Sequence, residues 1–175
     1  AISIMSDSDL KQLNFPQTIS DSSIKGIILV EICDKVVCDA LSQFNLPIVS
    51  VDMPNVPFEE LNGIDVVTME SKKNLKKIIN QLIEKGAESF GFVGDLYSPN
   101  VSRGFQERYN ALSECLAEHQ LPLNQKNCLL HQTPEDFRNF QTTVNNLQAM
   151  ISLPDVFICG NDWTAIQLIY ALQFL

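Results

Sequence analysis

The chain has 175 residues, 45% of them hydrophobic, and a formal net charge of −9. This length and composition can bury a core in one domain or in two small ones. The acidic charge disfavours direct contact with the phosphate backbone of a nucleic acid. No apolar run approaches the roughly 18 residues that a membrane span requires, and the N-terminal sequence lacks the features of a secretory signal peptide.

The predicted elements alternate regularly along the chain. Apolar, β-branched runs predict strands, and runs with apolar residues at helical spacing predict helices. The expected strands are residues 24–31, 46–52, 64–69, 90–94, 127–131 and 155–160. The expected helices are residues 34–44, 71–85, 101–119 and 134–151, and a last helix from residue 162 onward. Strands that alternate with helices indicate βαβ units and parallel sheets, so we expect an α/β fold.

Local signals sharpen two of these helices. Ser71 is placed to be the N-cap of the 71–85 helix, and Gly86 is placed to end that helix. Pro134 is placed in the first turn of the 134–151 helix, where its missing N–H costs nothing. The stop at Gly86 also indicates a domain boundary near residue 87, which predicts two parallel α/β subdomains. The chain ends inside an apolar helical pattern, so we expect it to be a piece of a longer protein, cut at both ends.

The cysteines and histidines give no sign of a cofactor, a metal site or a disulfide scaffold. The five cysteines are odd in number and form no CxxC motif, which indicates reduced thiols in a cytosol. His119 and His131 have no partners at metal-ligand spacing. Gly91 and Gly94 do not complete a GxGxxG motif, so a dinucleotide site is unsupported. No nucleophile, base and acid form a legible catalytic set, and we expect no enzyme activity.

Two strand-end loops carry the strongest functional signal. The first is SFGFVGD at residues 89–95, followed by ERYNAL at residues 107–112, and the second is VFICGNDWTA at residues 156–165. Each loop follows an apolar strand and ends in glycine and an acid before a helix. Ligand-binding groups collect at the carboxyl ends of parallel strands, so these loops can meet over a small polar ligand.

Five segments, in order and at the right spacing, resemble the effector-binding core of the lactose-repressor/galactose-repressor (LacI/GalR) family of bacterial transcription regulators. They are IKGIIL (24–29), LPIVSVD (46–52), QLIEKGAESFGFVGD (81–95), ERYNALSECL (107–116) and VFICGNDWTAIQLIYAL (156–172). The family shares its fold with periplasmic sugar-binding proteins. The resemblance implies that residues 1–87 belong to an N-terminal effector-binding subdomain and residues 88–175 to a C-terminal one, with the effector in the cleft between them. It also implies that the DNA-binding helix-turn-helix lies outside this chain.

The resemblance also implies the ligand contacts. Arg108 aligns with the family arginine that holds sugar hydroxyls or a carboxylate, although a surface arginine paired with Glu107 or Asp95 is the alternative. Asn161 and Asp162 align with the family Asn-Asp pair, with Asn161 expected to face the ligand and Asp162 to cap a helix. The remaining candidate contacts are Asp95, Asp52, His131 and Trp163; Trp163 is alternatively a packing residue.

The implied function is that of a cytoplasmic, DNA-binding regulator core that senses a small sugar or sugar phosphate. Its partners would be this effector, operator DNA through the absent domain, and a second copy of the chain. Val36, Val37, Ala40 and Leu41 are the candidate dimer contacts. The alternative reading is an extracytoplasmic sugar-binding receptor of an ABC transporter, which would have the same fold. Neither the identity of the sugar nor its effect as inducer or corepressor follows from the sequence.

Overall fold

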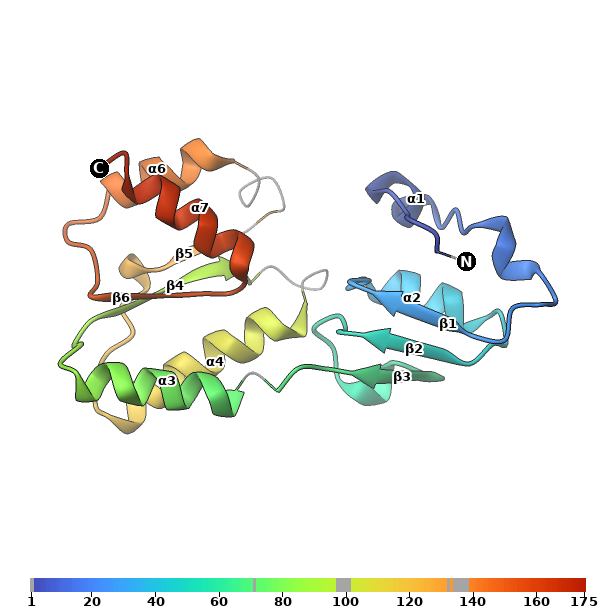
Figure 1. Cartoon of the computed structure of the whole chain (residues 1–175), viewed down its shortest axis with the longest axis horizontal. Coiled ribbons are helices and arrows are strands. Elements are labelled where there is room, and N and C mark those ends of the chain that lie inside the picture. Colours follow the sequence, from blue (N-terminus) through green and yellow to red (C-terminus); the bar gives the residue numbers. More distant parts are fainter. Residues whose placement is uncertain (1, 71, 97–101, 132, 134–138) are drawn as a thin grey trace. The chain divides into compact units, whose positions relative to one another are not determined.

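The computed structural model describes residues 2–70, 72–96, 102–131, 133 and 139–175. These residues form two compact units, one made of residues up to Met69 with Ser102 and Arg103, the other of the remaining described residues. Each unit contains one three-stranded sheet (Figure 1), and every strand pairing in both sheets is parallel. The prediction of an α/β fold with two parallel sheets is confirmed.

The first unit orders its strands as they occur in the chain, β1-β2-β3. Its elements are α1 (Asp7–Gln12), η1 (Gln17–Ser20), β1 (Ile27–Val30), α2 (Lys35–Ser42), β2 (Ile48–Val51), η2 (Phe58–Glu60) and β3 (Ile64–Val67). The helix α1 was not expected from the apolar pattern. It begins with a capping box, in which the Ser6 hydroxyl accepts from the Asp9 N–H and the Asp9 carboxylate accepts from the Ser6 N–H.

The core of the first unit lies on one face of its sheet. Strand residues such as Leu29, Ile48 and Ile64 pack there against the buried face of α2. Val37 and Leu41 of α2 are both buried in this core, so their side chains cannot contact a second copy of the chain. Val36 is exposed and stays a predicted dimer contact. The period of 3.6 residues explains this division, because Val37 and Leu41 are four residues apart and share one face.

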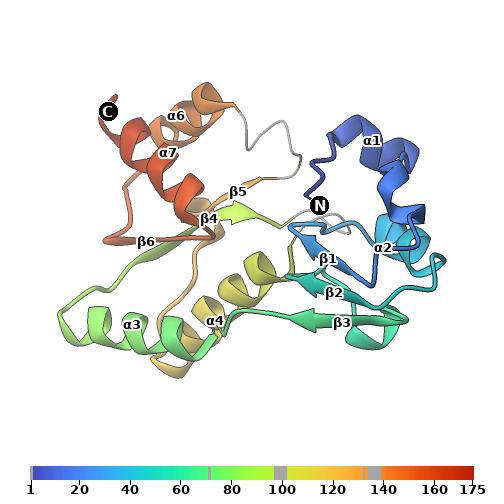
Figure 2. The same cartoon turned by 45° about the vertical axis from the view of Figure 1, so that its right-hand side comes forward.

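The second unit has the strand order β5-β4-β6 and helices on both faces of the sheet (Figures 1 and 2). Its elements are α3 (Lys72–Glu84), β4 (Phe90–Asp95), α4 (Arg103–Glu118), η3 (Gln125–Asn127), β5 (Leu129–His131), α6 (Phe140–Gln148), β6 (Val156–Cys159) and α7 (Asp162–Leu172). Phe90 and Phe92 face α3 and α4 in one core cluster, and Val93 faces α6 and α7 in the other. The central strand β4 is therefore buried along its whole length.

The helix α3 belongs to the second unit, which moves the boundary predicted near residue 87 to Met69 and Glu70. Its apolar face supplies Ile79 to the core cluster of Phe90 and Phe92, and this packing decides where the helix belongs. Gly86 does end the helix as expected. It has a φ of +97°, and the N–H groups of Gly86 and Ala87 donate to Ile83 and Leu82, the pattern of a Schellman motif. A strong helix stop thus marks the end of an element, not the end of a domain.

Ser71, the expected N-cap of α3, lies outside the described residues, and there the Glu70 carboxylate accepts from the Lys73 N–H. Pro134 also lies outside them. The described helix α6 begins at Phe140, with Asn139 as the N-cap that accepts from the Thr142 N–H.

Candidate ligand-binding site

The carboxyl edge of the second sheet gathers most of the polar side chains that the sequence indicates. In the strand order β5-β4-β6, the chain runs from the central strand β4 to β5 on one side of it and then to β6 on its other side. In such sheets a ligand crevice opens at the carboxyl ends of the two strands where the order reverses, here β4 and β6. Asp95 is the last residue of β4, and Gly160 follows β6 directly.

Asp95 and His131 form a buried pair at this edge. They occupy matching positions in the parallel register of β4 and β5, so their side chains leave the sheet on the same face. The His131 Nδ1 lies 2.6 Å from the Asp95 Oδ1, and both side chains are buried. The two atoms lie within hydrogen-bond distance of each other. This contact holds the imidazole ring and the carboxyl group in one relative orientation.

Arg108 reaches the same edge from the opposite face of the sheet. It projects from α4, and its Nη1 donates to the carbonyl oxygen of Gly160 at 2.7 Å. The observed contact of Arg108 is with this backbone carbonyl, not the ion pair with Glu107 or Asp95 that was the alternative. A half-buried guanidinium anchored by one N–H retains further donors in a planar fork, which suits hydroxyl or carboxylate oxygens.

Phe105 fixes the distance between α4 and the two strand ends. Its buried ring lies against both Gly94 and Gly160. A Cβ built on Gly94 would lie 2.8 Å from the Phe105 Cδ1, and one built on Gly160 would lie 2.2 Å from it. Neither distance is possible for real carbon atoms, so glycine is required at both strand ends. This explains why each strand-end motif carries glycine immediately before its polar residue.

Asn161, not Asp162, takes the capping role at the start of α7. The Asn161 Oδ1 accepts from the Thr164 N–H at 2.8 Å, and the Asn161 N–H donates to the Thr164 hydroxyl at 3.1 Å. Asn161 is therefore the N-cap of α7, and the expectation that Asp162 caps the helix is wrong. Asp162 is the first residue of the helix, exposed, and its Oδ1 accepts from the Trp163 N–H. Trp163 has 52% of its surface exposed, and both of its expected roles, ligand contact and packing, stay predictions.

Asp52 occupies the corresponding position in the first unit, directly after its central strand β2. Its φ of +69° is a left-handed conformation that aspartate tolerates better than most residues. Its carboxylate accepts from the Met53 N–H and from the Ser102 hydroxyl. Each unit thus presents an oriented carboxylate at the carboxyl end of its central strand.

The cysteines are not candidate nucleophiles. Burial, followed by the charge of Asp52, raises the pKa of the Cys33 thiol to about 12. Burial also raises the pKa of Cys38 and of Cys159 to about 11, and it raises the pKa of Cys115 and Cys128. A thiol needs a lowered pKa to react at neutral pH. Within the described residues, no group of three or more His, Cys, Asp or Glu side chains could hold a metal ion.

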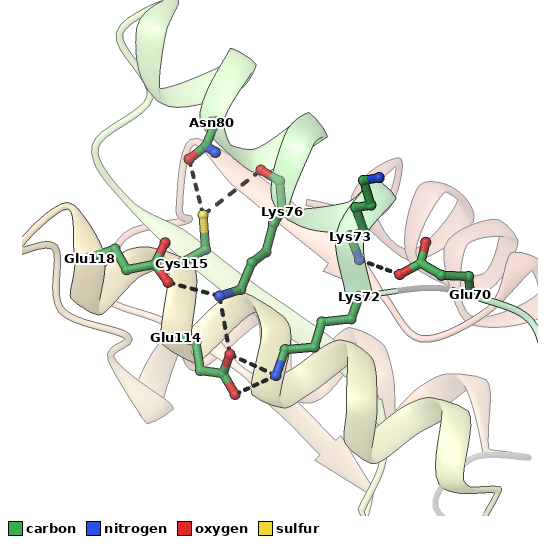
Figure 3. A network of polar contacts seen from close by, with 8 residues as sticks. All are labelled: Glu70, Lys72, Lys73, Lys76, Asn80, Glu114, Cys115 and Glu118. Atoms are coloured by element: carbon green, nitrogen blue, oxygen red, sulfur yellow. Dashed lines mark hydrogen bonds and ion pairs between the residues drawn. The ribbon is translucent and has the colours of Figure 1, made fainter.

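A second polar cluster joins the outer surfaces of α3 and α4 (Figure 3). Lys72 and Lys76 pair with Glu114, and Lys76 also pairs with Glu118. An open groove along α3 is lined by these lysines and by Glu70 and Glu84. The pairs are solvent-exposed, so each contributes little to the stability of the fold. Carboxylates neutralise the charges of Lys72 and Lys76. We interpret this cluster as a link between helices, separate from the carboxyl edge of the sheet.

The profile of the periplasmic binding protein-like domain matches residues 79–175. The chain belongs to this family. Catabolite control protein A of Staphylococcus xylosus is 30% identical over an alignment that covers 98% of this chain and 50% of that protein. The chain therefore spans about half the length of this curated relative.

Solved structures agree on the fold. The transcription regulator CcpA of Lactococcus lactis superposes with a TM-score of 0.70 at 14% identity, covering 95% of this chain and 57% of that one. A LacI-family regulator from Lactobacillus casei with bound sucrose gives a TM-score of 0.61 at 20% identity, covering 96% and 57%. The predicted fold family, the periplasmic binding protein-like domain, is confirmed, and the two solved structures with this fold are of transcription regulators. Within the described residues, no helix is long and apolar enough to cross a membrane.

Proposed function

We propose that this chain is the ligand-sensing core of a bacterial transcription regulator, and that a small sugar or sugar phosphate binds at the carboxyl edge of its second sheet. One observation carries the proposal. Arg108 and the Asp95–His131 pair come from opposite faces of the sheet to the strand ends where its order reverses. The sucrose bound to a regulator of the same fold supports a sugar as the class of ligand.

The chemistry of this edge suits a polyhydroxylated molecule. A sugar hydroxyl both donates and accepts, so it can donate to the Asp95 carboxylate while a neighbouring hydroxyl accepts from the Arg108 fork. Asn161, Asp162 and Trp163 stand at the start of α7 beside Gly160 and complete the predicted contacts of the second unit. Asp52 stays a predicted contact from the first unit, because its carboxylate is oriented in the same manner at a strand end.

The proposed signal is a change in the affinity of the whole protein for operator DNA. An effector shifts such an equilibrium only when it binds two conformations with different affinity. A DNA-binding domain outside this chain, a homodimer and a cytoplasmic location are parts of this proposal. They are supported by the transcription regulators to which the chain is similar. The sugar-binding receptor of an ABC transporter is the alternative proposal, since the matched family is that of periplasmic binding protein-like domains.

The test is the binding of sugars to the full-length protein, measured by titration calorimetry with sucrose, glucose and their phosphate esters. Arg108→Ala should weaken binding of the true effector by about 2–5 kcal/mol, the cost of losing one partner from a buried charged hydrogen bond. Arg108→Lys should restore only part of this loss, because an ammonium group cannot reproduce the planar fork.

Lys85→Ala is the matched control, since it removes one positive charge from an exposed position after α3. Its affinity for the effector should equal that of the wild type. An unchanged affinity in Arg108→Ala would remove Arg108 from the site and would leave the sheet edge without its proposed anchor.

A further inference from the structure

We propose that a second copy of this chain docks on the outer face of α7, with the two α7 helices packed antiparallel around a two-fold axis. This face, the α7 stripe, consists of Trp163, Ile166, Ile169 and Tyr170. The inference rests on the homodimer that is part of the proposed function, and it names the surface through which that dimer forms.

The helix α7 is apolar on its outer face as well as on its inner face. The inner face packs beside α6 on the second sheet (Figures 1 and 2), and there Thr164, Leu168 and Ala171 are buried. The outer face lies in solvent, and the exposed fractions of the four stripe residues lie between 46% and 58%. A helix that is apolar all round is normally buried all round. The stripe is therefore the part of α7 that another surface covers in the intact protein.

The spacing of the four residues makes them one continuous surface. Trp163, Ile166 and Tyr170 follow each other at three and four residues, so they stack along the helix, and Ile169 borders them on one side. The helix α3 of the same unit shows the usual arrangement, because its outer face carries lysines such as Lys76 that pair with carboxylates of α4. The outer face of α7 departs from this arrangement.

The lack of charge on the stripe indicates the kind of partner. The chain has a net charge of −9, so two copies repel each other wherever their carboxylates come close. From Trp163 to Leu175 the sequence has no charged side chain, so two acidic copies can approach each other across this face. The nearest charge is that of Asp162. In an antiparallel pair centred on Ile166, the two copies of Asp162 are about 12 Å apart along the helix axis, which exceeds the screening length of about 8 Å.

The stripe is also complementary to itself and large enough for a dimer. Ile166 lies near the midpoint between Trp163 and Tyr170, so a two-fold axis at Ile166 places Trp163 against the partner's Tyr170. Tryptophan and tyrosine are enriched in subunit interfaces, and charged residues are depleted there. Phe174, which is 65% exposed, extends the stripe beyond the end of the helix. At the areas typical of such side chains, two copies would bury roughly 1,000–1,200 Å² in total, and a biological interface needs about 1,000 Å².

The experiment measures the dissociation constant of the dimer by sedimentation velocity of the full-length protein, at concentrations from about 0.1 to about 50 µM. Ile166→Lys and Ile166→Glu each place two like charges beside the two-fold axis, so each should raise the dissociation constant at least about a hundredfold. An equal mixture of these two variants brings an ammonium group against a carboxylate. The mixture should therefore form dimers at least about tenfold more tightly than either variant alone.

Ile78→Lys and Ile78→Glu are the matched controls. Ile78 is the same residue type, has 51% of its surface exposed, and lies on α3 of the same unit. Each control variant should keep the dissociation constant within about twofold of the wild type, alone and mixed. Tyr170→Ala adds no charge and should raise the dissociation constant about tenfold or more, because a central aromatic contact is lost. Circular dichroism melts show whether each variant folds.

The outcomes separate this inference from the proposed function. A wild type that stays monomeric at about 50 µM overturns the inference and removes the homodimer from the proposed function, while calorimetry still decides sugar binding. A wild-type dimer that both Ile166 variants leave intact overturns the inference alone, and Val36 then remains as the predicted contact.

Two other results also overturn the inference. If both Ile166 variants unfold, or if they fold and their mixture regains no dimer, something other than a second copy covers the stripe. Conversely, dimers that the variants break and the mixture restores support the inference even in a protein that binds none of the tested sugars, and in that case only the proposed sugar sensing fails.

Discussion

Gly160→Ala is the most direct test of the geometry at the sheet edge. The new methyl group would lie 2.2 Å from both the Cδ1 and the Cε1 of Phe105, well inside van der Waals contact. Phe105 is itself buried and cannot swing into solvent without leaving a cavity. Relief therefore requires α4 to move away from the end of β6. Overpacking of this kind costs about 1–3 kcal/mol.

The measurable consequence is a lower melting temperature of the full-length protein in differential scanning calorimetry. For a domain of this size, about 1 kcal/mol shifts the melting temperature by roughly 2–4 °C. The same displacement moves the Gly160 carbonyl away from Arg108, so the affinity for the effector should fall together with the stability.

A double-mutant cycle identifies Phe105 as the cause. Phe105→Leu alone should destabilise by about 1–3 kcal/mol, as core truncations commonly do. The double variant should be more stable than the sum of the two losses predicts, with a coupling of at least about 0.5 kcal/mol. Gly63→Ala is the control: its φ of +74° makes alanine costly, but no atom lies within 4 Å of its new Cβ. The stability lost in Gly63→Ala should simply add to that lost in Phe105→Leu. If the losses of Gly160→Ala and Phe105→Leu add in the same way, the proposed contact is refuted.

Two further predictions concern ionisable groups. Hydrogen bonds, first from the Ser89 hydroxyl and then from the N–H groups of Glu88 and Ser89, lower the pKa of Asp155. A lowered pKa contributes stability that is present above the ordinary value of about 4 and is lost as the pH falls through the folded value. The difference in melting temperature between the wild type and Asp155→Asn should therefore be largest near pH 7 and vanish in strong acid; a difference that persists at pH 2 would contradict this. Since burial and the charge of Asp52 raise the pKa of Cys33 to about 12, Asp52→Asn should speed alkylation of Cys33 by iodoacetamide, while Cys38, followed in the same mass spectra, should not respond.

Most of the framework could be predicted because it depends on local signals. Apolar runs located all six described strands to within a few residues, and Gly86 ends α3 with the expected positive φ. Errors arose where local patterns compete. Asn161 and Asp162 are both good capping residues, and only the β-region backbone of Asn161 shows which of them precedes the first helical turn.

The site could be predicted only in part, because its geometry depends on strand order. Asp95 and His131 were each indicated as ligand contacts, but nothing in a single sequence places β5 beside β4 with these two residues in register. The contact of Phe105 with Gly94 and Gly160 likewise joins three segments far apart in the chain. A capping box at Ser6 and Asp9 was legible in principle, since Ser-x-x-Asp is a known helix-start pattern. The boundary near residue 87 was wrong for a different reason: the packing of α3 on the second sheet is a tertiary property.

The two sheets differ in how they are covered, and this difference leads to a last prediction. The second sheet has helices on both faces, as parallel sheets normally do. The first has an apolar face that this chain leaves in solvent, with exposed fractions of 73% for Ile28, 62% for Val30 and 57% for Val67. A patch of this kind indicates a surface that is covered in the intact protein. In the full-length protein, Val30→Lys and Val67→Lys should therefore each cost more than about 2 kcal/mol, because they bury an unpaired charge. Ile151→Lys, at a loop position with 98% exposure, should stay within about 0.5 kcal/mol. If all three substitutions are equally harmless in urea denaturation, the face is solvent-exposed in the intact protein too, and the physical rule that parallel sheets are covered on both sides fails here.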